Sequence, residues 1–358
     1  MITPKKLESY ANNEIVNIYT ELNEQLTKEI IKSIKSEGDI SSYTKHQLKV
    51  LIKNGGKDIF NKALMKTQKL TAKRKKEISK LFDDLVNEQY NGYEDMYKRK
   101  DIEYSISEES LYVASNIQRA VNKELNNLTR TIAFETKKEY VNAMDNLYKK
   151  IVSGGWSYDK AIKSTILDLV DKGITLKKDG TKYRLESKVR NDIFSSVRDL
   201  VRKIDSNIGD ELGLDYVWID ITPYCRPSHR PINGVKMKRS TFESKYEYLT
   251  EEYNCYHQPI SVDKEFVPLT SQSEINRANS NLEKRYKERQ KQNYYARQVR
   301  EKKRDIASVG NTNKDILKEK KKQLRNAQIK YRIFSLSNGF DVDYSQTWEA
   351  GYNGSRNR

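Results

Sequence analysis

Helix-breaking residues are scarce in this chain, and its apolar residues follow a helical period. Only six prolines and 15 glycines occur among 358 residues. Apolar side chains recur every three or four positions, as at Ile15, Ile18, Leu22, Leu26 and Ile30, which places them on one face of a helix. The same spacing predicts helices over about residues 4–36, 44–53, 58–100 and 108–150. We therefore predict an elongated helical region over residues 1–150.

Residues 151–270 have a different pattern, which predicts a small α+β core. Ser157 can cap a helix that Gly173 ends. Asp179-Gly180 then separates two short arms, as in a β-hairpin. The segment Asp215–Ile221 is rich in β-branched and aromatic residues, which is typical of a strand. The expected fold class is mostly α with a small α+β core.

The positive charge of the chain is concentrated toward its C-terminus. Lys and Arg number 67 against 50 Asp and Glu, a net charge of +17. Residues 271–332 alone hold 19 basic and 7 acidic residues, 19 − 7 = +12. Ser271 to Glu274 has the form of a capping box. We predict a basic helical hairpin over 271–335, with helices near 274–306 and 313–334, and a flexible tail over 336–358.

This charge balance favours a polyanionic partner. The candidates are a nucleic acid, an acidic protein surface and an anionic membrane. A membrane span is not expected, because no run approaches the roughly 18 apolar residues that one needs. The N-terminus lacks the hydrophobic stretch of a secretory signal. With only Cys225 and Cys255 as cysteines, we expect a reducing compartment such as a cytosol.

The predicted basic hairpin has the composition of a nucleic-acid contact. Tyr286, Tyr294, Tyr295 and Tyr331 are interleaved with Lys and Arg, a combination that suits base stacking and phosphate contacts. The alternative is a salt-bridged surface helix pair, although such a face usually balances its charges better. The candidate nucleic-acid-binding residues are Lys284, Arg285, Lys287, Arg289, Arg297, Arg300, Lys302, Lys303, Arg304, Lys318, Lys320, Lys321, Lys322 and Arg325.

Both cysteines and two of the three histidines lie within 33 residues. They form Cys225-x3-His229 and, further on, Cys255-x-His257. Two thiolates and two imidazoles are the ligand set of a tetrahedral structural zinc site. Because neither pair has C-x2-C spacing, two alternatives stay open. The residues tie two loops together without a metal, or a cysteine and a histidine act as nucleophile and base.

Other motifs do not indicate an enzyme. Gly55-Gly56-Lys57 lacks the first glycine of a phosphate-binding loop, and Asp58 stands where that loop needs Ser or Thr. The carboxylate pairs Asp83-Asp84 and Glu251-Glu252 lie among lysines, and we interpret them as solvated. No catalytic residues are therefore expected.

The middle of the chain resembles a known family. Arg226-Pro227-Ser228-His229, Ile232-Asn233-Gly234-Val235 and Tyr253-Asn254-Cys255-Tyr256-His257 look like the core signature of the minor capsid protein 2 family of tailed phages. They are more distantly similar to head-morphogenesis proteins of the Mu F type. The resemblance covers about residues 150–335, and Cys225 lies where many relatives have a small residue. By position, the family's marked residues are Arg190, Arg226, Pro227, Ser228, His229, Gly234, Asn254, Cys255 and His257.

The resemblance implies a virion component that is present in few copies and assists head assembly and genome packaging or ejection. The implied partners are the portal protein, the major capsid protein and phage double-stranded DNA, bound without sequence specificity. The implied location is the capsid interior or the portal vertex, and the host cytoplasm during assembly. Two other hypotheses stay open. The first is a zinc-dependent or cysteine-based enzyme that uses the cluster of Cys225, His229, Cys255 and His257. The second is a general nucleic-acid-binding module.

Overall fold

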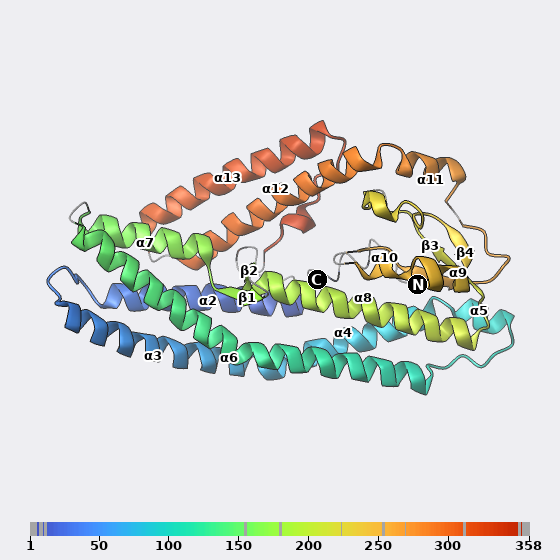
Figure 1. Ribbon diagram of the computed structural model, residues 1–358, viewed down its shortest axis with the longest axis horizontal. Helices are drawn as coiled ribbons and strands as arrows, with labels where there is room; N and C mark the ends of the chain where they lie inside the picture. The colour runs from blue at the N-terminus through green and yellow to red at the C-terminus, as the bar shows by residue number, and fades with distance from the viewer. Residues whose placement is uncertain are drawn as a thin grey trace. The chain divides into compact units, whose positions relative to one another are not determined.

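The computed structural model of the chain describes residues 6, 10, 13–153, 156–178, 181–222, 224–252, 255–268, 270–310, 313–349 and 352. Within these residues the protein is 74% helical with two small antiparallel sheets (Figure 1). This confirms the predicted fold class. Across the described residues, no helix combines the length and the apolar character needed to cross a membrane.

Helices make up most of the described chain, and its strands lie between residues 175 and 262. The helices are α2 (Glu14–Ser36), α3 (Lys45–Lys69), α4 (Thr71–Asn91), α5 (Glu94–Arg99), α6 (Glu108–Val152), α7 (Tyr158–Lys172), α8 (Leu185–Glu211), α9 (Arg239–Lys245), α10 (Glu247–Glu251), α11 (Gln272–Asn279), α12 (Leu282–Val309) and α13 (Lys314–Ser337). The 3-10 helices are η1 (Pro227–His229) and η2 (Tyr344–Thr347). The strands are β1 (Thr175–Lys178), β2 (Thr181–Arg184), β3 (Tyr216–Ile219), β4 (Lys236–Lys238) and β5 (Pro259–Val262).

Packing divides the chain into two compact units, each assembled from separate stretches of sequence. Unit 1 comprises Met1–Asn13, Lys75–Glu124 and Arg190–Lys291, and unit 2 comprises Glu14–Arg74, Leu125–Val189 and Gln292–Arg358. The long helices α6, α8 and α12 each pass from one unit into the other. The domain boundaries at 150, 270 and 335 stay a prediction from sequence.

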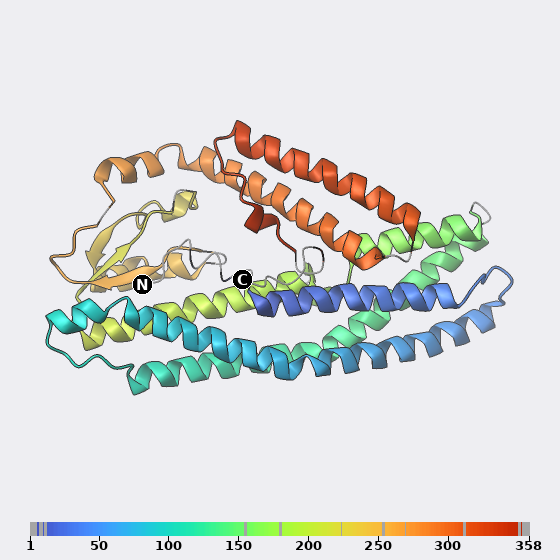
Figure 2. The same cartoon turned by 180° about the vertical axis from the view of Figure 1, so that it is seen from behind.

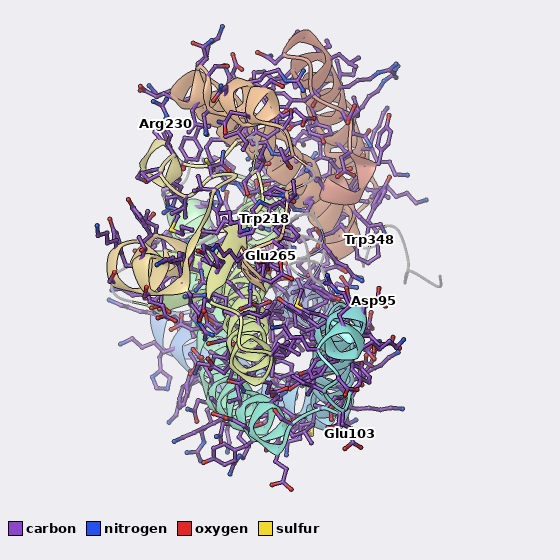
Figure 3. The ribbon with its side chains drawn as sticks, turned by 90° about the vertical axis from the view of Figure 1, so that its right-hand side faces the viewer. Asp95, Glu103, Trp218, Arg230, Glu265 and Trp348 are labelled. Atoms are coloured by element: carbon purple, nitrogen blue, oxygen red, sulfur yellow. The ribbon has the colours of Figure 1, made fainter. Side chains whose placement is uncertain are left out.

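A three-stranded antiparallel sheet in the order β4-β3-β5 lies in unit 1. Its central strand β3 falls within the segment that was predicted to be a strand. Val217 and Ile219 point to one face, where they pack with Phe242 in a buried cluster. On the alternate position, Trp218 packs its ring 5.4 Å from that of Phe266, and Figure 3 labels Trp218 among the side chains of this region.

Asp205 on α8 joins helices and sheet inside unit 1. Its carboxylate accepts hydrogen bonds from Tyr93 Oη at 2.5 Å, Gln89 Nε2 at 2.9 Å, and both the backbone N–H and the Oγ of Ser261 at 2.8 Å. The side chain is only 3% exposed. Because a buried carboxylate is costly unless it is hydrogen-bonded, this set of donors makes Asp205 a central anchor of the unit.

In unit 2, α3 continues where the sequence predicted two separate helices. It runs through Gly55 and Gly56 without interruption. A Cβ on Gly55 would lie only 2.7 Å from Cζ of Tyr140 on α6, so this glycine permits a close approach of the two helices. The close approach explains why a residue with poor helix propensity lies inside a long helix.

The predicted hairpin around residues 179–180 is also present in unit 2. β1 pairs with β2 in antiparallel register from Thr175↔Arg184 to Lys178↔Thr181, while the turn residues themselves lie outside the described residues. The preceding helix α7 has the expected ends. The Ser157 side chain accepts a hydrogen bond from Lys160 N, and Gly173 follows the helix with a φ of 61°.

The C-terminal helices of unit 2 form an antiparallel pair. Figures 1 and 2 both show α13 lying beside the later part of α12. Ala296, Val299 and Ile306 of α12 pack against Leu324 and Tyr331 of α13. The helix predicted over 274–306 is split into α11 and α12. The capping box of Ser271 and Glu274 begins the short α11, and α12 begins separately at Leu282.

Residues 340–349, which follow α13, pack on α12. The flexible tail over 336–358 stays a prediction from sequence. Phe340, Thr347 and Glu349 are buried. Lys303 Nζ donates to the Thr347 carbonyl at 2.6 Å, and Arg300 donates to the Gln346 carbonyl. Basic side chains of α12 therefore satisfy backbone carbonyls of this segment, a contact that composition alone does not reveal.

Candidate functional site

Three of the four predicted metal-ligand candidates meet in the interior of unit 1. His229 Nδ1 lies 3.2 Å from His257 Nδ1. Cys255 Sγ lies 3.6 Å from His229 Nδ1 and 3.5 Å from His257 Nδ1. The three residues are 1%, 4% and 1% exposed in the order His229, Cys255 and His257. We refer to them as the His–Cys–His cluster.

Two short backbone segments hold this cluster. Pro227 begins the 3-10 helix η1, and His229 ends it. Cys255 and His257 lie two positions apart in the segment just before β5. Arg230, labelled in Figure 3, follows η1 and donates to the Asn279 carbonyl at 3.2 Å.

Hydrogen bonds on the far side of each imidazole orient both rings. His229 Nε2 lies 3.1 Å from Glu252 Oε2, and Arg226 pairs with the same carboxylate oxygen. His257 Nε2 lies 3.1 Å from Asn233 Oδ1, which also accepts the backbone N–H of Thr222 at 2.7 Å. Such outer partners fix ring orientation and tautomer at metal sites.

Electrostatics inside the cluster follow from its burial. Burial, together with the nearby His229, lowers the pKa of His257 to about 3, so His257 is neutral at pH 7. Burial raises the pKa of the Cys255 thiol. Burial opposes ionisation of Glu252 as well, but the hydrogen bonds from His229 and Arg226 lower its pKa.

The fourth predicted ligand, Cys225, lies outside this group. It is buried and has a free thiol. Its pKa is raised to about 12, mainly by burial and next by the charge of Cys255. The structure therefore groups Cys255 with the two histidines. Cys225 is close enough to interact electrostatically with Cys255 but is not part of this group.

The remaining residues marked by the resemblance shape the turn around the cluster. Gly234 has a φ of 77°, and a Cβ there would lie 2.9 Å from Cγ1 of Ile275, so this position requires glycine. Arg226 pairs with Glu252. Ser228 is exposed, and Arg190 is half-buried on α8. Asn254 lies outside the described residues.

Sequence reasoning did not identify Glu252 and Asn233 as functional partners. Glu252 was interpreted as a solvated carboxylate, but it contacts His229 and Arg226. Asn233 is completely buried, and its amide nitrogen donates to Asn279 Oδ1 at 2.8 Å. The place of Asn233 in the Ile232–Val235 motif was the available signal, because its partners are distant in sequence.

The predicted nucleic-acid-binding residues differ in exposure. The exposed residues are Lys284, Lys287, Arg297, Lys318, Lys321, Lys322 and Arg325. The half-buried residues are Arg285, Arg289, Arg300 and Lys302. The buried residues are Lys303, Arg304 and Lys320. Each buried residue has a partner in unit 2. Arg304 pairs with Glu186, Lys320 pairs with Asp171 and Asp305, and Lys303 donates to the Thr347 carbonyl.

Most of the exposed basic residues of α13 lie on one side of that helix. At 100° per residue, one stripe comprises the exposed Lys314, Lys318, Lys321, Lys322, Arg325 and Arg332, which we call the basic face of α13. Ile316, Lys320, Leu324, Tyr331 and Ser335 are buried on the opposite side. The sequence prediction missed Lys314 and Arg332, although helical spacing from Lys318 includes both.

Comparison with known proteins gives a match over nearly the whole chain. The sequence profile of phage minor capsid protein 2 matches residues 2–335. Neither the curated proteins nor the solved structures contain a significant match. Because the profile covers almost all of the sequence, the protein has a structural role in a phage head, and the chain belongs to the phage minor capsid protein 2 family.

Proposed function

We propose that this capsid protein contacts packaged double-stranded DNA through the basic face of α13. The observation that carries the proposal is the one-sided array of exposed cations from Lys314 to Arg332. The acidic residues of α13 are Asp315 and Glu319, so the face keeps a large positive excess. Lys and Arg arrayed in this way neutralise phosphates without reading base sequence.

The dimensions of the basic face suit a DNA backbone. At about 1.5 Å of rise per residue, Lys314 to Arg332 spans about 27 Å. One DNA strand carries a phosphate about every 3.4 Å, so about eight phosphates extend over that length. A contact of this kind is non-specific and weakens as salt rises, which suits a protein that meets a genome of any sequence.

The opposite side of α13 supports the face mechanically. Leu324 and Tyr331 pack into the apolar cluster with α12, and Gln292 donates to Ser335 Oγ at 3.0 Å. Asn313 caps the first turn by accepting the Ile316 N–H at 3.1 Å. The basic side chains therefore project from a helix that is already packed and capped.

We also propose that the protein is held in the head by the portal or major capsid protein, inside the capsid or at the portal vertex, and assists assembly and genome packaging or ejection. Membership of the minor capsid protein 2 family supports this proposal. Its function there is structural and needs no enzymatic step. Cross-linking of assembled particles followed by mass spectrometry tests which of the two proteins is the neighbour.

Fluorescence anisotropy with a short labelled duplex tests the DNA contact. The full chain should bind with an affinity that falls steeply as salt rises. The triple variant Lys318→Gln, Lys321→Gln, Arg325→Gln should bind more weakly, and the slope of log affinity against log salt should shrink by about 2 to 3. A slope that stays unchanged in this variant overturns the proposal.

A charge-matched control separates a local contact from net charge. Lys62, Lys98 and Lys138 each pair with a carboxylate on their own helix, namely Asp58, Glu94 and Glu135. The variant Lys62→Gln, Lys98→Gln, Lys138→Gln loses the same three charges. It should retain most of the wild-type slope. An equal loss in both triple variants would assign binding to net charge and contradict a role for the basic face.

A further inference from the structure

We infer that His229, Cys255 and His257 bind one Zn²⁺ ion within unit 1. Zinc lies about 2.0–2.1 Å from histidine nitrogens and about 2.3 Å from a thiolate. Tetrahedral coordination then separates two nitrogens by about 3.4 Å and a nitrogen from a sulfur by about 3.6 Å. The separations in the cluster are 3.2 Å for the nitrogens and 3.6 and 3.5 Å for sulfur and nitrogen. The separations of these three atoms therefore match those of three corners of a zinc tetrahedron.

The hydrogen-bond network supplies a second, independent argument. The Glu252 carboxylate is also bound by Arg226, so it accepts a hydrogen bond from His229 Nε2. Asn233 Oδ1 accepts the Thr222 N–H, so this atom is the carbonyl oxygen of the amide and accepts from His257 Nε2 as well. In the neutral form of each ring, the proton is therefore on Nε2.

This assignment leaves a lone pair on each Nδ1. The two Nδ1 atoms face each other at 3.2 Å, and two acceptors at that distance repel unless a positive charge lies between them. A zinc ion bound to both nitrogens removes the repulsion. The competing explanation is a proton, which would convert His229 into an imidazolium that donates to His257.

The third ligand favours the metal over the proton. Cys255 Sγ lies near both Nδ1 atoms, and a thiolate with two imidazoles is a donor set that selects zinc over magnesium or calcium. On binding, the Cys255 thiol loses its proton to solvent as the Zn–S bond forms. Glu252 and Asn233 then serve as outer partners that hold the rings in place.

The bound ion would link η1 to the segment that leads into β5. Ile232, just after η1, belongs to the buried cluster with Val217 and Phe242. Fixing η1 to the Cys255–His257 segment therefore fixes one edge of that cluster. A water molecule is left to complete the tetrahedron, since Cys225 lies outside the group. This inference does not rest on the proposed DNA contact.

Metal analysis of the purified full chain tests the site. After reconstitution with zinc and removal of excess metal, the wild type should hold about one zinc per chain. X-ray absorption should show two nitrogens and one sulfur as protein ligands. Zinc far below one per chain overturns the proposal and favours the alternative, in which a proton lies between His229 and His257. A coordination shell with no sulfur or with two sulfurs also overturns the proposal. The wild-type result does not depend on whether any variant folds.

Matched variants test the ligand assignment. Cys255→Ser and His257→Gln should lose the zinc, whereas Cys225→Ser and His46→Gln should keep it. Cys225 is a second buried cysteine, and His46 is an exposed histidine on α3. Loss of zinc in Cys225→Ser overturns the three-ligand site and shows that Cys225 is a fourth ligand beside His229, Cys255 and His257. Retention of zinc in Cys255→Ser overturns the assignment altogether.

Discussion

The Nδ1 atoms of His229 and His257 lie 3.2 Å apart although the residues are separated by 28 positions in the sequence. Each ring is fixed from its far side, by Glu252 and by Asn233 respectively. The close approach therefore belongs to a built arrangement of two loops, and not to a chance contact of two mobile side chains. A zinc ion bound between the two nitrogens, as inferred above, would add to the stability of unit 1.

Removal of metal is expected to lower the thermal stability of unit 1. A ligand that binds only the folded state stabilises it by about 4 kcal/mol when present at a thousand times its dissociation constant. A strong zinc chelator should therefore lower the melting temperature of the wild type, as measured by calorimetry. Cys255→Ser should melt lower than wild type and show no further decrease with the chelator. An identical melt with and without chelator in the zinc-loaded wild type would contradict this expectation.

Loss of the Asp205 carboxylate is expected to be strongly destabilising. Asp205→Ala removes the carboxylate that accepts from Tyr93, Gln89 and Ser261. Tyr93 Oη keeps the Ser261 carbonyl as an acceptor, but the buried backbone N–H of Ser261 loses the Asp205 carboxylate, and an unsatisfied buried donor costs about 1–3 kcal/mol. We expect a loss of at least about 2 kcal/mol in urea denaturation. Asp210→Asn is the matched control, because Asp210 is exposed and pairs with Arg239 at the surface. It should change stability by less than about 1 kcal/mol.

The adjacent glycines of α3 are expected to respond differently to substitution by alanine. At Gly55 the new Cβ would collide with Tyr140, whereas at Gly56 its nearest neighbour is Lys137 Cε at 3.5 Å, an ordinary contact. Alanine is favoured over glycine inside a helix by about 1 kcal/mol. Gly55→Ala should therefore destabilise the protein and Gly56→Ala should leave it unchanged or stabilise it. Equal effects in thermal denaturation would show that α3 and α6 do not approach closely at Gly55.

Glu24 is expected to make unit 2 less stable as pH rises. Burial, with the nearby Glu349 as the next cause, raises its pKa from 4.5 to about 8. The folded state then binds a proton that the unfolded state has released, so this contribution is complete below pH 4.5 and is lost as pH rises through 8. Glu24→Gln should be less sensitive to pH between these values in chemical denaturation. Glu319→Gln, an exposed substitution on α13, should retain the wild-type dependence.

Local elements of the fold could be predicted because their signals are local. Apolar residues at helical spacing indicated the long helices, Asp179-Gly180 indicated the hairpin, and the β-branched residues around Val217 indicated β3. The continuity of α3 could not be predicted, because Gly55 has a low helix propensity. The residue that requires a glycine there, Tyr140, lies 85 positions away in the sequence. Propensity therefore gave way to packing at this site.

The candidate site was predicted in composition but not in geometry. The Cys and His spacing identified His229, Cys255 and His257, but it could not separate them from Cys225 or reveal Glu252 and Asn233 as their partners. The basic residues show the same limit. Lys320 has the same neighbours in sequence as the exposed Lys321, yet it is buried against Asp171 and Asp305. Only the arrangement of the helices decides which lysine faces solvent.

Photo-cross-linking inside assembled phage particles tests the proposed DNA contact most directly. A photoreactive amino acid would replace Lys318 or Lys321 on the basic face of α13, or Lys62 on α3 as a control. After irradiation and nuclease digestion, we expect nucleotide adducts on the protein for both α13 positions and few for Lys62. Particles that contain the protein but give no adducts at Lys318 and Lys321, or equal adducts at Lys62, would contradict a DNA contact through the basic face.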